Sequence, residues 1–253
     1  MKTLQLKFKI ISNLPVGGKY FKLTLDAGKI AQRAIPGQFI MLKVSDGLSP
    51  LLRRPLGVHR VNKNKVELLY EVIGPGTKIL MQKKPGEYLD IIGPLGNGFT
   101  LKQRPVLIAG GMGVAPLVFL AGKLSRQKPL VLIGAKTKNH ILCVKEFKKF
   151  SCAVKIATDD GSLGFKGRVT DLFRDYLSTI NHRTLTIYAC GPKPMLREVA
   201  AISQKYSVPA QISLEAHMSC GFGACMGCAV ETKAGQKRVC QDGPVFDSQE
   251  VIW

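Results

Sequence analysis

The chain can be interpreted outward from Cys220-Gly221-Phe222-Gly223-Ala224-Cys225-Met226-Gly227-Cys228, which Cys240 follows after eleven further residues. The spacing C-x4-C-x2-C-x11-C is typical of the plant-type ligand set of a [2Fe-2S] cluster. We expect Gly221, Gly223 and Gly227 to adopt positive φ values, so that a single loop can wrap the cluster. The four predicted ligands are Cys220, Cys225, Cys228 and Cys240.

Two other interpretations of these cysteines are possible. A zinc site prefers two C-x2-C pairs, and the segment contains only one. A disulfide framework requires an oxidising compartment. The spacing and the glycines favour the iron-sulfur cluster over both. The remaining cysteines, Cys143, Cys152 and Cys190, are predicted to be reduced thiols in cores or at strand ends.

Composition limits the class of protein. The 253 residues are 45% hydrophobic, which predicts a globular fold with a substantial core. No apolar segment follows Met1-Lys2, and no run of about 18 apolar residues occurs, so we expect a cytoplasmic protein without a membrane span.

The net charge of +20 raises nucleic acid as a possible partner. The lysines are scattered without interleaved aromatic residues, and residues 213–253 carry three basic and five acidic side chains. A solvated basic surface that attracts anionic cofactors is the favoured interpretation. A nucleic-acid-binding module is the alternative, and it would bind with a steep dependence on salt.

Residues 1–101 contain short alternating segments separated by Gly and Pro turns, which predicts a small antiparallel β-barrel. Within it lies Arg53-Arg54-Pro55-Leu56-Gly57, followed later by Gly74-Pro75-Gly76-Thr77 at the start of a short helix. A guanidinium fork and a helix N-terminus both suit a diphosphate. Taken singly, each has a plainer explanation: a surface ion pair for the arginines, and a tight turn with a capping threonine for the second motif.

Residues 102–212 contain apolar strands alternating with helical stretches, which predicts an α/β unit with a parallel sheet. Strands are expected at residues 106–109, 130–135, 153–157 and 184–189, with a helix at 117–124. Ligands of such sheets bind at the carboxyl ends of the strands. Three loops lie there: Gly110 to Pro116, Thr158 to Ser162, and Cys190 to Leu196. The first has proline where the dinucleotide fingerprint has its third glycine, so by itself it is a weak signal.

Together these regions resemble the ferredoxin–NADP reductase superfamily. With the cysteines included, the whole chain resembles the electron-transfer subunits of NAD-linked dihydroorotate dehydrogenases, two-subunit bacterial enzymes of pyrimidine synthesis. The resemblance implies a β-barrel plus α/β fold with an FAD-binding barrel at 1–101, an NAD-binding α/β domain at 102–212 and a [2Fe-2S] domain at 213–253. The motifs that carry it are Leu52-Arg53-Arg54-Pro55, Ile92-Gly93-Pro94-Leu95-Gly96-Asn97-Gly98-Phe99, Asp159-Asp160-Gly161-Ser162, Ser213-Leu214-Glu215 and Asp242-Gly243-Pro244-Val245-Phe246.

The resemblance also implies binding residues. Many relatives carry serine near flavin N5 where this chain has Gly57, so that contact would have to come from backbone or water. Residues expected at FAD are Arg53, Arg54, Pro55, Leu56, Gly57, Leu69, Tyr70, Glu71, Val72, Gly76 and Thr77. Residues expected at NAD are Gly111, Gly113, Val114, Ala115, Pro116, Asp159, Asp160, Cys190, Gly191 and Pro192.

Charge favours NAD over NADP, because Asp159-Asp160 at a strand end would repel a 2′-phosphate. The plainer explanation of these aspartates is an ordinary turn or helix cap.

The implied function is a relay in which electrons pass between NAD, FAD, the [2Fe-2S] cluster and a second flavin in a partner. Nothing in the chain resembles a proton-abstracting base for dihydroorotate, so no catalytic residue is predicted. His217 is expected to be a packed loop residue rather than a metal ligand. The predicted partner is a catalytic FMN-type dihydroorotate dehydrogenase subunit, in a heterotetramer of two copies of each chain.

Other redox subunits, of sulfite reductase, hydrogenase or transhydrogenase type, would share the same units. A stand-alone NADH:acceptor reductase is a further alternative, and it would need no docking face.

Overall fold

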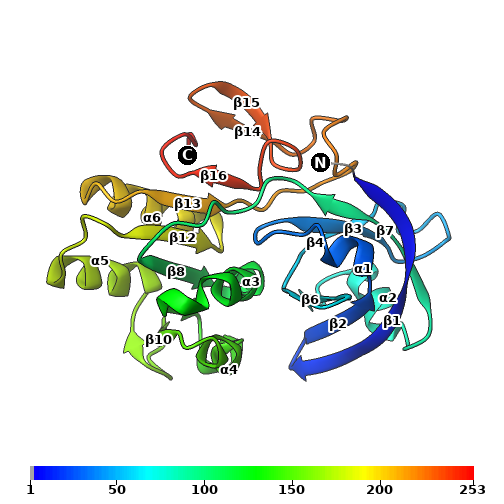
Figure 1. Cartoon of the computed structure of the whole chain (residues 1–253), viewed down its shortest axis with the longest axis horizontal. Helices are drawn as coiled ribbons and strands as arrows, with labels where there is room; N and C mark the ends of the chain where they lie inside the picture. The colour runs from blue at the N-terminus through cyan, green and yellow to red at the C-terminus, as the bar shows by residue number, and fades with distance from the viewer. Residues whose placement is uncertain (1–2) are drawn as a thin grey trace.

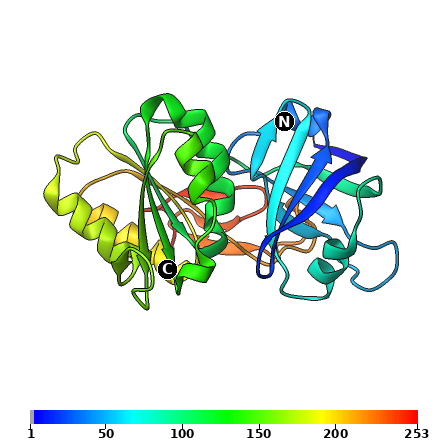
Figure 2. The same cartoon turned by 90° about the horizontal axis from the view of Figure 1, so that it is seen from below.

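The computed structural model describes residues 3–253 and contains two seven-stranded sheets that lie side by side (Figures 1 and 2). The first is antiparallel, in the order β4-β3-β7-β1-β2-β6-β5. Its strands are β1 (Leu4–Gly17), β2 (Tyr20–Asp26), β3 (Phe39–Lys43), β4 (Arg54–Gly57), β5 (Arg60–Asn62), β6 (Lys65–Glu71) and β7 (Tyr88–Leu95). Helices α1 (Gly28–Ala31) and α2 (Pro75–Gln82) complete this unit. The edge strands β4 and β5 are not paired with each other, so this is a half-barrel.

Alternation along β1 shows how the sequence forms this sheet. Phe8 and Ile10 are buried in the core, whereas Lys7 and Lys9, which alternate with them, are exposed. Because successive side chains of a strand point to opposite faces, this alternation places Phe8 and Ile10 on the inner face of the sheet and the two lysines on the outer face.

The second sheet has the order β11-β10-β9-β8-β12-β13-β16. Six strands are parallel: β8 (Pro105–Gly110), β9 (Leu130–Ala135), β10 (Ala153–Thr158), β11 (Phe165–Lys166), β12 (Thr186–Cys190) and β13 (Ala210–Ser213). The α-helices are α3 (Val114–Leu124), α4 (Val144–Lys149), α5 (Val169–Thr179) and α6 (Lys193–Lys205). Short 3-10 turns η1 (Gly111–Gly113), η2 (Ser125–Gln127) and η3 (Lys138–His140) complete the unit.

Alternate residues of the buried strands supply two cores. Leu107 and Ala109 of β8 pack in the core that contains α3 and α4, whereas Val106 and Ile108 pack in the core that contains α5 and α6. Helices therefore cover both faces of the sheet, as expected when strands are apolar throughout. The chain runs from β8 outward to β11 and then returns to β12 on the other side of β8, so the strand order reverses between β8 and β12.

Two features of this sheet differ from the sequence prediction. The short strands β11 and β13 were not predicted, because two to four residues give too little periodicity to recognise. The sheet also contains β16 (Val245–Asp247), which pairs antiparallel with β13. The last part of the chain therefore extends the second sheet.

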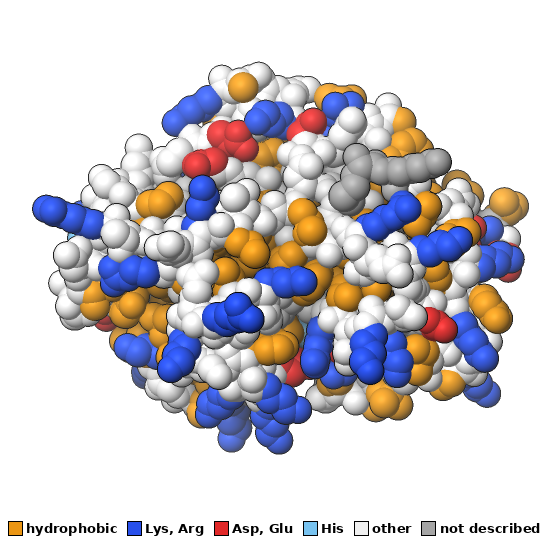
Figure 3. All heavy atoms as spheres, viewed as in Figure 1, with side chains coloured by type: hydrophobic (Ala, Val, Ile, Leu, Met, Phe, Trp, Pro, Cys, Tyr) orange, Lys and Arg blue, Asp and Glu red, His pale blue; other side chains and the backbone are white. Residues whose placement is uncertain are grey.

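The remaining strands, β14 (Ala229–Thr232) and β15 (Gly235–Arg238), form a hairpin that lies above the junction of the two sheets in Figure 1. On the face shown in Figure 3, lysines and arginines are spread over both sheets, and apolar side chains gather near the middle. Within residues 3–253, no helix is both long enough and apolar enough to cross a membrane.

Candidate functional site

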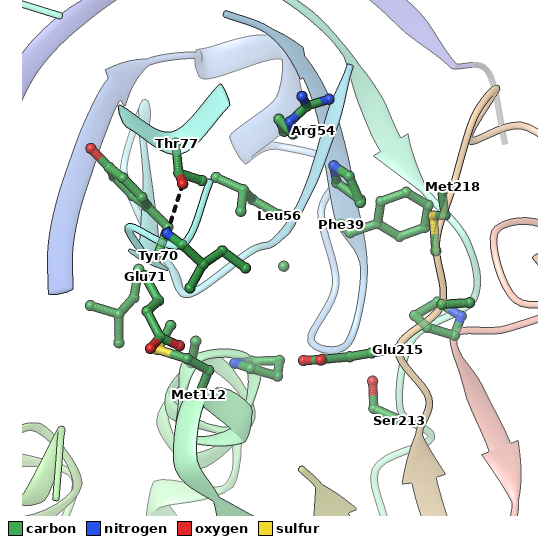
Figure 4. Close-up of a pocket in the computed structure, with 18 of the residues that line it drawn as sticks. Phe39, Arg54, Leu56, Tyr70, Glu71, Thr77, Met112, Ser213, Glu215 and Met218 are labelled. Atoms are coloured by element: carbon green, nitrogen blue, oxygen red, sulfur yellow. Dashed lines mark hydrogen bonds between the residues drawn. The ribbon is translucent and has the colours of Figure 1, made fainter. Parts of the chain in front are cut away.

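A cavity of about 580 Å³ lies at the junction of the two sheets and is lined by segments far apart in the sequence (Figure 4). One wall comes from β3, β4, β6 and the start of α2. The opposite wall comes from Met112, the first turn of α3 and Cys190 at the end of β12. Residues 213–218, with Pro244, close a third side. Its volume is within the range of cofactor sites.

Arg54 lines this cavity and lies directly over Gly76 at the start of α2. A Cβ atom at Gly76 would lie 2.3 Å from the Arg54 Nε atom, so a larger residue would displace the guanidinium group. Arg54 also donates from Nη1 to the Leu52 carbonyl oxygen at 2.6 Å. A positive charge and a helix N-terminus therefore lie together at one end of the cavity, which is an arrangement suited to a diphosphate.

Thr77 caps the helix with its side chain. Its Oγ1 accepts hydrogen bonds from the backbone nitrogens of Ile73 at 3.0 Å and Gly74 at 3.2 Å. The plainer explanation of this motif, a turn with a capping threonine, is therefore correct for the side chain. The first N–H groups of the helix have no partner within it and are still available to an anion.

Tyr70 is among the residues that line the cavity, but its side chain is almost wholly buried: the ring stacks on Phe21, with centroids 5.8 Å apart, and the hydroxyl donates to Asn13 Oδ1 at 3.0 Å. Burial raises the pKa of Tyr70 to about 12, so the hydroxyl stays protonated and uncharged near neutral pH.

Arg53 does not line the cavity, and neither does Val72. The Arg53 guanidinium pairs with Asp90, at 3.0 Å from Nη2 to Oδ1, and Nη1 donates to the Asp90 carbonyl oxygen at 2.8 Å. Burial tends to raise the pKa of Asp90, but hydrogen bonds from Arg53 and Gln5 outweigh it and lower the pKa. The ion-pair explanation is therefore correct for Arg53 but not for Arg54, for which no ion pair is observed.

The loops after β8 and β12 meet beside the cavity. A Cβ atom at Gly113 would lie 1.9 Å from the Cys190 carbonyl oxygen, and one at Gly191 would lie 3.0 Å from the Gly110 Cα atom. Glycine at these positions lets the two backbones touch where the strand order reverses, which is the usual ligand position of such sheets. Of the residues expected at NAD, Ala115, Pro116 and Cys190 line the cavity. Gly111, Gly113, Gly191 and Pro192 lie in these two loops and Val114 begins α3, all outside the lining.

Asp159 and Asp160 lie further along the same edge, after β10, and do not line the cavity. Asp160 Oδ1 accepts hydrogen bonds from Ser162 N at 3.0 Å and Ser162 Oγ at 2.6 Å, and these bonds lower the pKa of Asp160. Asp160 therefore forms the turn that follows β10, while its charge remains at the edge of the sheet.

Sequence reasoning did not predict several residues of the cavity wall. Glu215 is one of them; although its side chain is open to the cavity, the surrounding protein, and then the charge of Glu71, raise the pKa of its carboxyl group. The motif Ser213-Leu214-Glu215 contributes to the family resemblance, but the sequence does not predict which ligand it would contact. The unpredicted wall residues are Gly37, Phe39, Ile73, Gly74, Pro75, Met112, Ser213, Leu214, Glu215, Ala216, His217, Met218 and Pro244.

The four cysteines of the motif lie around the base of the β14–β15 hairpin. Cys228 precedes β14 and Cys240 follows β15; both are buried, and the Cys240 backbone nitrogen donates to Cys228 Sγ at 3.4 Å. Cys225 is exposed. Burial opposes ionisation of Cys220, but the N–H groups of the loop, Phe222 first, lower the pKa of this thiol to about 6. Such a thiol readily supplies the thiolate that iron requires.

The backbone of the cysteine loop differs in one respect from the prediction. Gly221 and Gly223 have φ values of +82° and +90°, as expected, but Gly227 does not have a positive φ. Met226 takes the left-handed conformation in its place, with φ of +58°. The turn of the C-x2-C pair therefore lies one residue earlier, and the prediction for Gly227 was wrong.

The cysteine loop adjoins the cavity. A Cβ atom at Gly221 would lie 2.5 Å from the Met41 Cγ atom of β3, and Phe39, two residues earlier on that strand, lines the cavity. Met218 also lines the cavity and precedes Cys220 by two residues. A group bound in the cavity would therefore be a near neighbour of a cluster bound by the loop.

Two motifs noted in the sequence hold this loop against the first sheet. Asn97 donates from Nδ2 to the carbonyl oxygens of Gln241 at 3.2 Å and Asp242 at 3.0 Å. Gly96 packs so closely on Gly243 that a Cβ atom would lie 2.6 Å from the Gly243 carbonyl oxygen.

Comparisons with known proteins agree with this architecture. Residues 215–252 match the family model described as the iron-sulfur cluster binding domain of dihydroorotate dehydrogenase B, and residues 107–201 match the oxidoreductase NAD-binding domain. A solved structure described as the NADH-dependent reduced ferredoxin-NADP oxidoreductase, from work on flavin-based electron bifurcation, superposes with a TM-score of 0.87 at 30% identity. That comparison covers 97% of this chain and 90% of the other. The fold is thus the ferredoxin–NADP reductase type, as predicted.

Curated relatives match over nearly their whole length. The dihydroorotate dehydrogenase B (NAD(+)) electron transfer subunit of Desulforamulus reducens is 41% identical, and the comparison covers 97% of each chain. The subunit of the same name from Caldanaerobacter subterraneus subsp. tengcongensis is 38% identical, over 98% of this chain and 99% of the relative. Together with the junction cavity and the cysteine loop beside it, this similarity shows that the chain belongs to the family of electron transfer subunits of NAD-linked dihydroorotate dehydrogenase B.

Proposed function

We propose that the chain relays electrons between NAD and a partner flavoprotein that oxidises dihydroorotate, in the synthesis of UMP. The observation that carries this proposal is the position of the cavity, whose walls include the loops expected to bind NAD and adjoin the cysteine loop. A group bound there would have the nicotinamide on one side and the cluster on another. The three proposed cofactor units are residues 1–101 for FAD, 102–212 for NAD and 213–253 for the cluster.

FAD fits the cavity through the chain's own groups. Arg54 and the N-terminus of α2 would hold the diphosphate, and Pro55, Leu56 and Gly57 would supply a wall for the ring system. Pro116 and Cys190 face the same space from the second sheet, where the nicotinamide would be held. When bound, the flavin and the [2Fe-2S] cluster would supply the exchange between two-electron and one-electron chemistry, and the protein would hold them in place.

NAD is proposed in preference to NADP. A dinucleotide that extends from the cavity along the carboxyl ends of β8, β9 and β10 would reach Asp159 and Asp160. Two carboxylates there would repel a 2′-phosphate, whereas a carboxylate suits the ribose hydroxyl of NAD.

The partner is proposed to dock over the cysteine loop. Cys225 is exposed there, together with two large apolar side chains, Phe222 at 54% and Met226 at 46% exposure. Exposed apolar groups beside a redox centre suit a protein interface that excludes water. We propose a catalytic FMN-type subunit, two copies of each chain, and a cytoplasmic location, where the three cysteines outside the cluster motif would stay reduced.

The experiment compares the isolated chain, checked by mass spectrometry, with the chain plus its catalytic partner. The isolated chain with both cofactors should pass electrons from NADH to an artificial acceptor but should be inert toward dihydroorotate. Adding the partner should produce dihydroorotate-dependent reduction of NAD. Reduction of NAD by dihydroorotate with the isolated chain would contradict the proposal. If the chain oxidised NADH but passed no electrons to the partner, it would more readily be a flavin and iron-sulfur subunit of another redox complex. The similarity to the solved ferredoxin-NADP oxidoreductase structure, which is 30% identical, also points to that class.

A further inference from the structure

A buried group of polar side chains joins the two halves of the molecule outside the cavity. His59 follows β4 of the first sheet and is fully buried, whereas Cys143 and Glu146 belong to the second unit, before and within α4. One ligand atom from each residue lies within 4.8 Å of the others. Lys22 of β2 reaches the same Glu146 oxygen, at 3.2 Å from Nζ to Oε1.

The contacts of His59 determine where its hydrogens lie. Nδ1 lies 2.9 Å from the carbonyl oxygen of Ala115, which can only accept, so Nδ1 carries a hydrogen. Nε2 lies 3.4 Å from Glu146 Oε1, within ion-pair distance. The ring therefore lies between a carbonyl oxygen at Nδ1 and a carboxylate oxygen at Nε2.

A metal ion is an alternative occupant, because His, Cys and Glu are all zinc ligands. Two observations argue against it. The Lys22 ammonium group already provides a positive charge at Glu146 Oε1. Among the described residues the group also offers only three ligand atoms, whereas a structural zinc site has four. Although burial works against ionisation of Glu146, hydrogen bonding to His59 and the nearby positive charges hold its pKa well below the usual range.

The bond to Ala115 lies next to the cavity. Ala115 and Pro116, in the first turn of α3, form part of the wall contributed by the second sheet. Gly57 of β4, two residues before His59, faces them from the first sheet, where a Cβ atom would lie 3.8 Å from Pro116 Cβ. The His59–Ala115 hydrogen bond thus links the wall from the first sheet to the wall from the second sheet, close to the place where Gly57 approaches Pro116.

We propose that His59 is a positioning residue for hydride exchange, which holds the Ala115–Pro116 wall at a fixed distance from the Gly57 wall through its bonds to Ala115 and Glu146. The inference rests on the proposed function, because it takes the cavity as the place where flavin and nicotinamide meet. Hydride transfer requires close approach of the two rings, and a displacement of about 1 Å can cost up to about a hundredfold in rate.

Two substitutions test separately the two contacts of the His59 ring, one with Ala115 and one with Glu146. In His59→Asn, the amide nitrogen can occupy the position of Nδ1 and keep the bond to Ala115. In His59→Gln, it can reach the position of Nε2 and keep the contact with Glu146 but not the bond to Ala115. His182→Gln is the matched control, since His182 Nδ1 also contacts a backbone carbonyl oxygen, that of Ile180 at 3.3 Å, and the residue does not line the cavity.

The measurement is the stopped-flow rate of flavin reduction by NADH in the holoprotein, with NADH deuterated at the transferred position as a second substrate. We expect His59→Gln to lower the limiting rate about tenfold or more and to raise the isotope effect, with the Kd for NADH changed less than about threefold. His59→Asn should recover most of the rate, and His182→Gln should match the wild type. If His59→Gln does not fold, Glu146→Gln, which weakens the anchoring of the ring, should show a smaller decrease of the same kind.

Equal rates in His59→Asn and His59→Gln, or a Glu146→Gln rate equal to wild type where it replaces His59→Gln, would overturn the inference. So would stoichiometric zinc that is present in the wild type and lost from both His59 variants. These results test only the positioning role of His59. Failure of the proposed function would appear differently, as a wild-type holoprotein whose flavin NADH does not reduce.

Discussion

Arg53 and Arg54 are neighbours in the chain, but their guanidinium groups have different surroundings. Arg54 lines the cavity above Gly76, whereas Arg53 is paired with Asp90. Arg54→Ala should therefore weaken FAD binding by about 1.5–3 kcal/mol, or roughly one to two decades in Kd, because a charge-assisted bond to phosphate is lost. Equilibrium dialysis of the flavin measures this.

Arg53→Ala is the control for that experiment. It should lower the melting temperature, because Asp90 loses its partner in a half-buried position, but it should leave the Kd for FAD close to wild type. A larger loss of FAD affinity in Arg53→Ala than in Arg54→Ala would reverse the assignment of the two side chains.

The three cysteines outside the motif should be unreactive in the native protein. Burial raises the pKa of Cys152 to about 11 and raises the pKa of Cys143 and Cys190 further. At about pH 9, a thiol with an ordinary pKa near 9 is about half ionised, whereas Cys152 would be about 1% thiolate.

Alkylation at that pH followed by peptide mass spectrometry should therefore label these three cysteines only after denaturation. Rapid labelling of Cys190 in the native state, at a rate comparable with that of free cysteine, would contradict its burial beneath the loop after β8.

At the level of elements, the cysteine loop depends on a tight backbone conformation. Gly223 has φ of +90°, and a Cβ atom there would lie 1.7 Å from Gln241 Oε1, beside Cys240. Gly223→Ala should therefore displace Gln241, disturb the neighbouring ligand and lower the content of iron and labile sulfide. Chemical analysis of both elements in the purified protein measures the effect.

Gly235 provides a matched comparison. It lies at the start of β15 with φ of +92°, but nothing lies within 4 Å of an added Cβ atom. Gly235→Ala has the same backbone cost, about 1–3 kcal/mol, without the clash. It should keep a full cluster. If both variants lost the same amount of iron and labile sulfide, backbone strain alone would explain the effect.

For the whole molecule, the last segment is part of both the cavity and the second sheet. Seven cavity-lining residues, 213–218 and Pro244, lie within 213–253, and β16 pairs with β13. Removal of residues 213–253 should therefore release FAD and lower the melting temperature, in addition to removing the cluster.

Cys225→Ser, in the same segment, should affect the cluster but not FAD. It removes a predicted cluster ligand without changing the cavity wall, so it should lose the absorbance of the cluster and keep FAD. A truncated chain that retained FAD as well as Cys225→Ser does would contradict the role of the last segment in the cavity.

The strands that the sequence predicted are those with a long enough run of apolar or alternating residues. Strands β8, β9 and β10 have four to six apolar or alternating residues and were predicted within two residues of their bounds. Strands β11 and β13 were missed because they are two and four residues long. Strand β16 was missed because Val245 and Phe246 gain a strand conformation from pairing with β13, which is over thirty residues away in the chain.

The sequence alone determined the fold class and the spacing of the cysteines, because side-chain period and loop spacing are local properties of the chain. Only the tertiary structure decided which arginine faces the cavity, that residues 213–218 form its third wall, and that His59 joins the two halves. These are contacts between segments more than twenty residues apart, and local patterns do not encode them. They arise when two separately patterned sheets bury their facing surfaces against each other, which brings distant polar groups within hydrogen-bond reach.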